Sequence, residues 1–227
     1  MDRRVCEVWW ATPDLARRPH LDLLDDAERG RREALRRDVD RDRFTIGAAL
    51  LRLVVGAVLG VAAASVPVVR DCAGCGRPHG RPRIDGSDLH VSVSHSGRRV
   101  AVACGRAGPL GVDVEEIAAV DVPGLASTVL AADETVTGLN DFFTYWTRKE
   151  AVVKATGDGL SVPLRDVLVS APDAAPALHA YPGREVHAWM YDLAPGAGYA
   201  GALAVLTGTP VEVRERSGAA LLAGARD

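Results

Sequence analysis

The sequence predicts an α+β protein built from two similar halves, residues 1–106 and 107–227. A helix-rich stretch precedes a pair of strands in each half, and glycines between residues 105 and 111 form a natural joint. The length of 227 residues also allows the chain to bury a sizeable core, either as one domain or as two packed halves.

The first half is expected to begin with a strand and to continue through two helices to two paired strands. The expected strands cover residues 5–10, 89–94 and 100–104, and the helices cover residues 25–37 and 40–59. The apolar run at residues 53–66 is shorter than the roughly 18 residues that a membrane span needs, so a buried helix is expected there. We therefore expect no membrane association.

The second half is expected to begin with a strand around Val112, followed by two helices and two strands. The helices cover residues 122–130 and 141–155, and the strands cover residues 185–191 and 199–206. In the second helix Phe143, Trp146 and Val153 recur at helical spacing, and the glycines at 157 and 159 stop the pattern.

The chain contains only two lysines, Lys149 and Lys154, beside 25 arginines. Both lie in that second helix, where a compact ammonium suits a phosphate oxygen. Trp146, Glu150 and Lys154 share one face of such a helix. Taken alone, Glu150 and Lys154 equally fit an ordinary surface ion pair, so the helix by itself leaves both interpretations open.

A second motif, residues 111–116 (GVDVEE), alternates apolar and acidic side chains. In a strand, Val112 and Val114 would face the core, and Asp113 and Glu115 would project together from the other face. Two neighbouring carboxylates repel each other, so they either face water or hold a hard cation through oxygen ligands. A solvent-facing strand would show the same pattern.

The two motifs together resemble the signature of the 4'-phosphopantetheinyl transferases. That family carries Gly-x-Asp-x-Glu and, further along the chain, Trp-x-x-Lys-Glu-x-x-x-Lys, and both are complete here, at residues 111–115 and 146–154. Residues 159–164 (GLSVPL), 91–97 (VSVSHSG) and 80–82 (GRP) are also similar to family segments, with Arg81 in place of a lysine. The similarity extends over residues 28–165 and is typical of the longer, surfactin-synthetase-activating type.

This resemblance implies a fold and a reaction. The longer members are pseudo-dimers of two α+β halves with the active site in the cleft between them. They transfer the 4'-phosphopantetheine arm of coenzyme A to a serine of an apo acyl or peptidyl carrier protein, and adenosine 3',5'-bisphosphate is released. The reaction depends on Mg²⁺, for which Asp113, Glu115 and Glu150 are the implied ligands.

The resemblance also implies roles at the reacting phosphates. Glu150 would accept the proton of the attacking serine, directly or through a metal-bound water. Lys154 would contact the α-phosphate and offset charge on the leaving group, and Asp113 would lie against coenzyme A as well as the metal. Lys149 would either contact phosphate or pair with a neighbouring acid.

Further residues are implied to bind coenzyme A through its phosphates. Ser94 and His95 belong to the matched Ser-His-Ser segment, and the resemblance implies that His95 is also a catalytic residue, although a lone histidine is more often structural. Arg31, Arg43 and Arg81 would bind phosphate groups at the nucleotide end, where a guanidinium can grip bidentately. Arg31 and Arg43 also lie in a run of alternating charges that would suit any solvated helix.

The carrier protein is implied to dock on residues 117–129, which are largely apolar and follow the acidic motif. A buried amphipathic helix would have the same pattern. The sequence leaves the carrier open among those of fatty-acid, polyketide and nonribosomal-peptide synthesis. Two halves in one chain favour a monomer.

Composition limits the other possibilities. A net charge of −3 gives no case for nucleic-acid binding, and Glu7 interrupts any apolar region after the basic residues 1–4, so a cytoplasmic protein is expected. Cys72, Cys75 and His79 form half of a zinc-site pattern without a second half, which favours a reduced turn. The remaining alternatives are another magnesium-dependent enzyme acting on nucleotide pyrophosphates, and a zinc-binding adaptor without catalytic activity.

Overall fold

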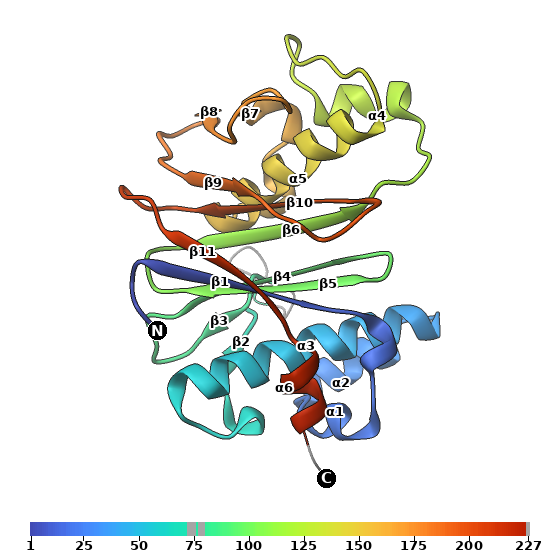
Figure 1. Ribbon diagram of the computed structural model, residues 1–227, viewed down its shortest axis with the longest axis vertical. Coiled ribbons are helices and arrows are strands. Elements are labelled where there is room, and N and C mark those ends of the chain that lie inside the picture. Colours follow the sequence, from blue (N-terminus) through green and yellow to red (C-terminus); the bar gives the residue numbers. More distant parts are fainter. Residues whose placement is uncertain (72–75, 77–79, 226–227) are drawn as a thin grey trace.

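The computed structural model describes residues 1–71, 76 and 80–225, and it shows an α+β fold arranged in layers (Figure 1). Helices cover the outer face of one sheet, a second sheet packs on its inner face, and a further helix covers the second sheet. The mixed α+β class predicted from the sequence is confirmed. In the described part of the chain no helix is both long and apolar enough to cross a membrane.

The larger sheet has the strand order β11-β1-β5-β4-β3-β2, and the smaller one has the order β6-β10-β9. A two-stranded sheet pairs β7 with β8. The strands are β1 Val5–Ala11, β2 Val68–Val69, β3 Arg83–Ile84, β4 His90–Ser96, β5 Arg99–Gly105, β6 Leu110–Glu116, β7 Leu168–Val169, β8 Leu178–Ala180, β9 Trp189–Asp192, β10 Tyr199–Val205 and β11 Glu212–Ser217.

The α-helices are α1 Arg18–Asp22, α2 Asp26–Glu33, α3 Asp38–Leu59, α4 Val122–Val129, α5 Leu139–Thr156 and α6 Ala219–Gly224. Helix α3 packs on the outer face of the large sheet, and α5 packs on the small sheet (Figure 1). Between the sheets lies a core of small and branched side chains, among them Val8, Ala103, Val112 and Leu203, all fully buried. The apolar strand faces therefore bring the two halves together.

Strands β4 and β6 lie side by side but belong to different sheets. Every second residue of β4 is a serine whose hydroxyl accepts a backbone N–H of β6. The pairs are Ser92 with Val112 at 3.1 Å, Ser94 with Val114 at 3.4 Å and Ser96 with Glu116 at 3.1 Å. We call Ser92, Ser94 and Ser96 the serine ladder. It satisfies backbone donors that a neighbouring strand would otherwise have to pair.

Gly111 opens the acidic motif because α5 approaches β6 closely there. A Cβ at this position would overlap the carbonyl oxygen of Ala151 and come within 2.7 Å of Cβ of Lys154. Glycine therefore lets one turn of α5 lie directly on the strand. At its C-terminal end α5 stops at Gly157, which adopts the left-handed conformation with φ of 82°.

Three expected elements differ from those observed. Helix α2 ends at Glu33 rather than at residue 37, because the chain turns there to start α3. The apolar run 53–66 is not one helix, since Gly60 with φ of 71° ends α3 after Leu59. The strand expected at residues 185–191 is wrong in its first part, because pairing with β10 begins only at Trp189.

The end of the chain returns to the first half. Strand β11 pairs in parallel with β1, and α6 lies beside α3 (Figure 1). Leu222 of α6 is buried in the same core cluster as Leu50 and Val54 of α3. Residues 212–224 thus pack against the first half, although they belong to the predicted second half. The division into residues 1–106 and 107–227 stays a prediction.

Candidate active site

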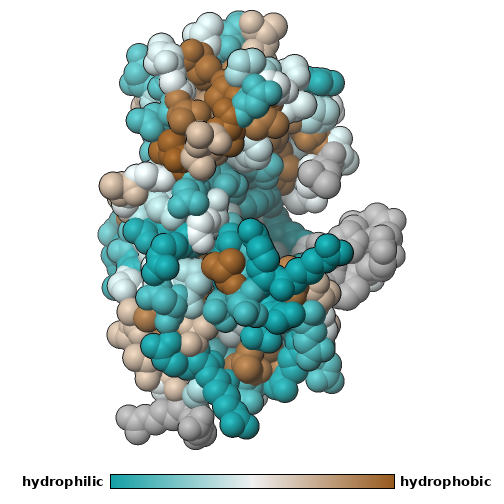
Figure 2. Space-filling view, turned by 90° about the vertical axis from the view of Figure 1, so that its right-hand side faces the viewer, coloured by the Kyte–Doolittle hydropathy of each residue, from teal (hydrophilic) through white to brown (hydrophobic). Residues whose placement is uncertain are grey.

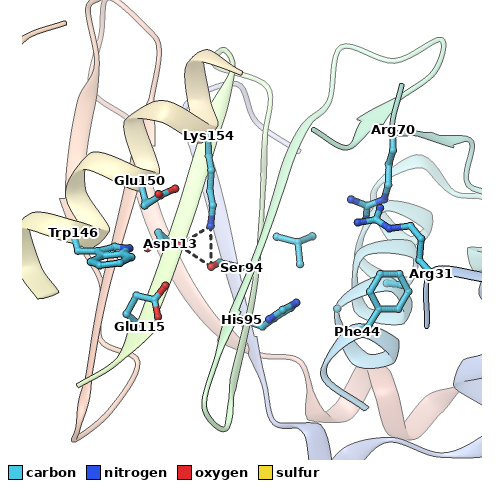
Figure 3. Close-up of a pocket in the computed structure, with 13 residues that line it drawn as sticks. Arg31, Phe44, Arg70, Ser94, His95, Asp113, Glu115, Trp146, Glu150 and Lys154 are labelled. Atoms are coloured by element: carbon cyan, nitrogen blue, oxygen red, sulfur yellow. Dashed lines mark hydrogen bonds and ion pairs between the residues drawn. The ribbon is translucent and has the colours of Figure 1, made fainter. Parts of the chain in front are cut away.

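A cavity of about 390 Å³ opens where α2, α3, β4, β6 and α5 meet (Figure 3). Carboxylates and one ammonium from β6 and α5 line one side of it. Two arginines and a phenylalanine line the opposite side, and His95 lies between the two groups. The cavity thus has an acidic end and a basic end, each built by a different half of the chain.

Helix α5 supplies Trp146, Glu150 and Lys154 to the acidic end. The three side chains follow each other along one face of the helix, as their spacing predicts, and point toward the cavity (Figure 3). The opposite face packs Val152 and Ala155 against the small sheet. Packing of this apolar face fixes the rotation of α5.

Strand β6 supplies Asp113 and Glu115. Val112 and Val114 are fully buried between the two sheets, so the predicted alternation is confirmed. Asp113 is nevertheless only 2% exposed, because α5 and β4 close over it. An ordinary solvated strand would not hide this carboxylate.

Asp113 is bound on one of its two oxygens. Its Oδ1 accepts hydrogen bonds from Lys154 Nζ at 2.6 Å and from Ser94 Oγ at 2.8 Å. Its Oδ2 is buried and, among the described residues, has no hydrogen-bond partner. A buried acceptor left without a donor is costly unless a ligand satisfies it.

The surroundings of the other two carboxylates, Glu115 and Glu150, disfavour their charged forms. Burial raises the pKa of Glu115 to about 7, and the charge of Asp113 adds to this effect. Burial, followed by the charge of Asp113, also raises the pKa of Glu150. Both groups would ionise more readily beside a cation.

The three carboxylates of the acidic end are of the kind that the implied magnesium ion binds. Within the described ranges, no three His, Cys, Asp or Glu side chains are arranged so that they could hold a metal ion without moving. The donors are nonetheless all carboxylate oxygens, which Mg²⁺ prefers, and Oδ2 of Asp113 is unsatisfied. The chemistry of the donor set therefore fits a hard divalent cation.

The basic end contains Arg31, which the sequence pointed to, and Arg70, which it did not. The guanidinium of Arg31 lies 5.5 Å from the centre of the Phe44 ring. Arg70 Nε is buried, lacks a hydrogen-bond partner among the described residues, and lies 3.9 Å from Glu28. Nothing in the sequence distinguished Arg70 from the other arginines.

A buried ion cluster holds this end in place. Arg52 of α3 donates to Glu28 Oε2 at 2.9 Å and to Asp25 Oδ2 at 2.6 Å, which ties α2 to α3. Burial lowers the pKa of Arg70, and the carboxylate of Glu28 opposes that shift. A phosphate beside Arg70 would compensate its buried charge further.

His95 follows Ser94 at the end of β4 and lines the middle of the cavity. Desolvation lowers the pKa of His95, and the charges of Arg43 and Lys154 act in the same direction. Its side chain remains accessible. An anion in the cavity would favour its protonated form.

Two of the arginines expected to bind phosphate do not line this cavity. Arg43 pairs with Asp40 of the same helix at 2.8 Å, and its side chain is half-buried. Arg81 donates to the carbonyl of Ala155 at 2.6 Å, where it caps the C-terminal end of α5. Their binding of phosphate stays a prediction.

Known proteins resemble the part of the chain that builds the acidic end. A family model described as the 4'-phosphopantetheinyl transferase superfamily matches residues 109–204, a segment that contains Asp113, Glu115, Glu150 and Lys154. This segment of the chain is similar to that superfamily. The 4'-phosphopantetheinyl transferase HetI of Nostoc sp. is 33% identical over 146 residues, which is 60% of each chain.

Other 4'-phosphopantetheinyl transferases show similar agreement. The protein psf-1 of Bacillus pumilus is 31% identical over 145 residues, which is 60% of this chain and 59% of its own length. Sfp of Bacillus subtilis (strain 168) is 35% identical over 94 residues, 38% of this chain and 42% of its own. The matches thus span about three fifths or less of these relatives' lengths.

Lys149, the first lysine of the motif at residues 146–154, does not line the cavity. Its ammonium is fully buried and bonds to the carbonyl of Val129, at 2.8 Å, and to the carboxylate of Glu134. Of the two roles left open by the sequence, the structure therefore shows pairing with an acid. Lys149 fixes the segment between α4 and α5.

In the described part of the chain, no cysteine lines the cavity. Cys72, Cys75 and His79, which carried the half zinc pattern, lie outside the described residues. Cys6 and Cys104 are free and buried. Burial raises the pKa of the Cys6 thiol to about 12, so this sulfur is a poor nucleophile.

Proposed function

We propose that this chain transfers the 4'-phosphopantetheine arm of coenzyme A to a serine of an apo acyl or peptidyl carrier protein. Adenosine 3',5'-bisphosphate is the released product. One observation carries the proposal: a single cavity joins the buried Asp113–Lys154 pair at one end to Arg31 and Arg70 at the other. Coenzyme A has matching charge, with a pyrophosphate at its centre and a phosphate on its ribose.

The basic end would bind the nucleotide. Arg31 and Arg70 would contact the ribose phosphate, because planar guanidinium groups match phosphate oxygens. Phe44, whose ring lies beside Arg31, offers a flat apolar surface for the adenine. Ser94 and His95 would face the pyrophosphate from the middle of the cavity.

Asp113, Glu115 and Glu150 would hold Mg²⁺ at the acidic end. When bound, the ion would neutralise charge on the pyrophosphate oxygens. The unsatisfied Oδ2 of Asp113 and the raised pKa values of Glu115 and Glu150 support this assignment.

The reaction is a displacement at the phosphorus that carries the pantetheine arm. The serine oxygen of the carrier forms a new bond to this phosphorus, and the bond from phosphorus to the bridging oxygen of the pyrophosphate breaks. Lys154 would place its ammonium near the leaving oxygen and offset the negative charge that develops there. The cavity supplies orientation and charge rather than a covalent intermediate.

The proton of the serine needs an acceptor. Glu150 lines the cavity one turn of α5 after Trp146, so a hydroxyl that arrives beside Trp146 would come within its reach. Its pKa, raised by burial and by the charge of Asp113, makes it a stronger base than an ordinary glutamate. Glu150 would take the proton directly or through a bound water.

The carrier protein would dock beside Trp146. Figure 2 shows apolar side chains gathered on the upper part of the molecule, which carries α4 and α5, above a largely hydrophilic lower part. Ile117, Val122 and Leu125 are only partly buried there, and Val120 is 36% exposed. Trp146 belongs both to this apolar cluster and to the cavity, so a carrier helix on α4 would present its serine to Glu150.

Several finer assignments belong to the same proposal. The two α+β halves would represent the pseudo-dimer of the longer, surfactin-synthetase-activating transferases, acting as a monomer in the cytoplasm. Its carrier would come from fatty-acid, polyketide or nonribosomal-peptide synthesis. Neither nucleic acid nor membrane has a role in this mechanism.

The test is to incubate the protein with coenzyme A, Mg²⁺ and several apo-carriers and then to measure the mass of each carrier. A carrier heavier by one phosphopantetheine arm supports the proposal. Cleavage of coenzyme A with no change in any carrier would instead indicate a hydrolase of nucleotide pyrophosphates.

A further inference from the structure

The serine ladder makes different contacts at each of its rungs. Every hydroxyl accepts one backbone N–H of β6. Ser94 also donates to Oδ1 of Asp113 at 2.8 Å, and Ser96 donates to Oε2 of Glu115 at 2.7 Å. Within the described residues, the hydroxyl of Ser92 bonds to the Val112 amide and to no carboxylate.

Ser96 has its hydrogen-bonding directions fixed on both sides. The N–H of Glu116 occupies an acceptor position of its hydroxyl at 3.1 Å, so the single hydroxyl proton is free to point at Glu115. A hydroxyl that is already oriented by the backbone loses little entropy when it holds a carboxylate. Ser96 is therefore built to restrain the side chain of Glu115.

This restraint matters because a glutamate has three rotatable bonds. Glu115 lies near the end of β6 and is only partly buried, so packing alone does not select one rotamer. Asp113, two residues earlier, is shorter, 2% exposed and held by Lys154 as well as by Ser94. Of the two carboxylates on the strand, Glu115 depends more on a single hydrogen bond.

We infer that Ser96 is a positioning residue that orients Glu115 toward the divalent cation of the acidic end. The inference rests on the proposed function, because it takes Glu115 as a ligand of that cation. Ser96 itself touches neither the cation nor the reacting phosphates. Groups that hold a metal ligand in this way commonly change metal affinity tenfold or more when removed.

Metal binding by the purified protein tests the inference without catalysis. Mn²⁺ would serve as the probe, titrated in the absence of coenzyme A and followed by the loss of its free electron paramagnetic resonance signal. Ser96→Ala should weaken Mn²⁺ binding by about tenfold. Ser96→Thr, which keeps the hydroxyl, should stay within about twofold of the wild type.

Ser92→Ala is the matched control. It removes the same kind of bond to an amide of β6 but no contact with a carboxylate, so it should lose stability and keep Mn²⁺ affinity. Equal affinity of Ser96→Ala and the wild type would overturn the inference. Equal losses in Ser92→Ala and Ser96→Ala would also overturn it, because the ladder would then act only on the fold.

Asp113→Asn separates the inference from the proposed function. If the wild type binds Mn²⁺ and Asp113→Asn does not, an unaffected Ser96→Ala refutes the role of Ser96 alone. If the wild type does not bind Mn²⁺, both the proposed cation site and the role of Ser96 are refuted. In turnover, Ser96→Ala should raise the Mg²⁺ concentration for half-maximal activity about tenfold, with the KM for coenzyme A unchanged at saturating Mg²⁺.

Discussion

Lys154 on α5 donates a hydrogen bond to Oδ1 of Asp113 on β6 across 2.6 Å. This contact joins the motif at residues 111–115 to the motif at residues 146–154, and it lies beneath the surface, since the side chain of Asp113 is 3% exposed. Gly111 makes the contact possible, because any larger residue there would push α5 away from the strand.

Removing the ammonium should leave Asp113 buried with an uncompensated charge. Lys154→Met is expected to lower the free energy of unfolding by about 2 kcal/mol at neutral pH without divalent cation. Adding Asp113→Asn should recover most of that loss, because the charge that needed compensation is then absent. Urea denaturation of the two single variants and the double variant measures this, and strictly additive losses would contradict the pairing.

Gly111→Ala should damage both stability and activity. The new methyl group overlaps the backbone of α5, so we expect a loss of about 2 to 3 kcal/mol and a displaced Glu150 and Lys154. Gly208→Ala is the control, since nothing lies within 4 Å of a Cβ added there. Thermal unfolding of both variants measures the difference in stability. A Gly111→Ala protein as stable as the control would contradict the close approach of α5 to β6.

The basic end should recognise the phosphate on the ribose. Arg70→Gln and Arg31→Gln are each expected to raise the KM for coenzyme A about tenfold with little change in kcat, because they remove binding shared by substrate and transition state. With dephospho-coenzyme A, which lacks this phosphate, the variants should match the wild type. Arg214→Gln, on the exposed edge strand β11, serves as the control. An equal rise in KM with both substrates would indicate that these arginines contact a part of coenzyme A other than the ribose phosphate.

Stability without metal should depend on pH through Glu115. Its pKa is raised from 4.5 to about 7 on folding, so the folded state binds this proton more tightly than the unfolded state does. The stability that this group contributes is complete below pH 4.5 and is lost as the pH rises through about 7. Glu115→Gln should therefore show a smaller fall in the free energy of unfolding over this range, measured with a chelator present. Parallel pH profiles would contradict the raised pKa, and Mg²⁺ should restore stability at the upper end.

The acidic end could be predicted well from the sequence because it depends on local periodicity. A period of two places Asp113 and Glu115 on one face of β6, and a three- to four-residue spacing places Trp146, Glu150 and Lys154 on one face of α5. The resemblance to the transferase family then predicted that these two faces meet in one site. The α+β class followed from the same patterns.

The remaining features depend on contacts between distant segments, which no local pattern contains. The return of β11 to β1 is an example, since its charged, exposed sequence has no apolar alternation. Arg70 lines the cavity next to Glu28, which Arg52 of a different helix holds in place. Lys149 differs from Lys154 by its direction on the helix, and only packing shows that it is buried against Glu134.

The most direct test of the central claim is the mass of an apo-carrier after incubation with coenzyme A and Mg²⁺. The account predicts that the wild type adds one phosphopantetheine arm and that folded Asp113→Asn and Glu150→Gln add none. A carrier that a known transferase loads but that the wild type leaves unchanged would contradict it. So would full loading by either variant.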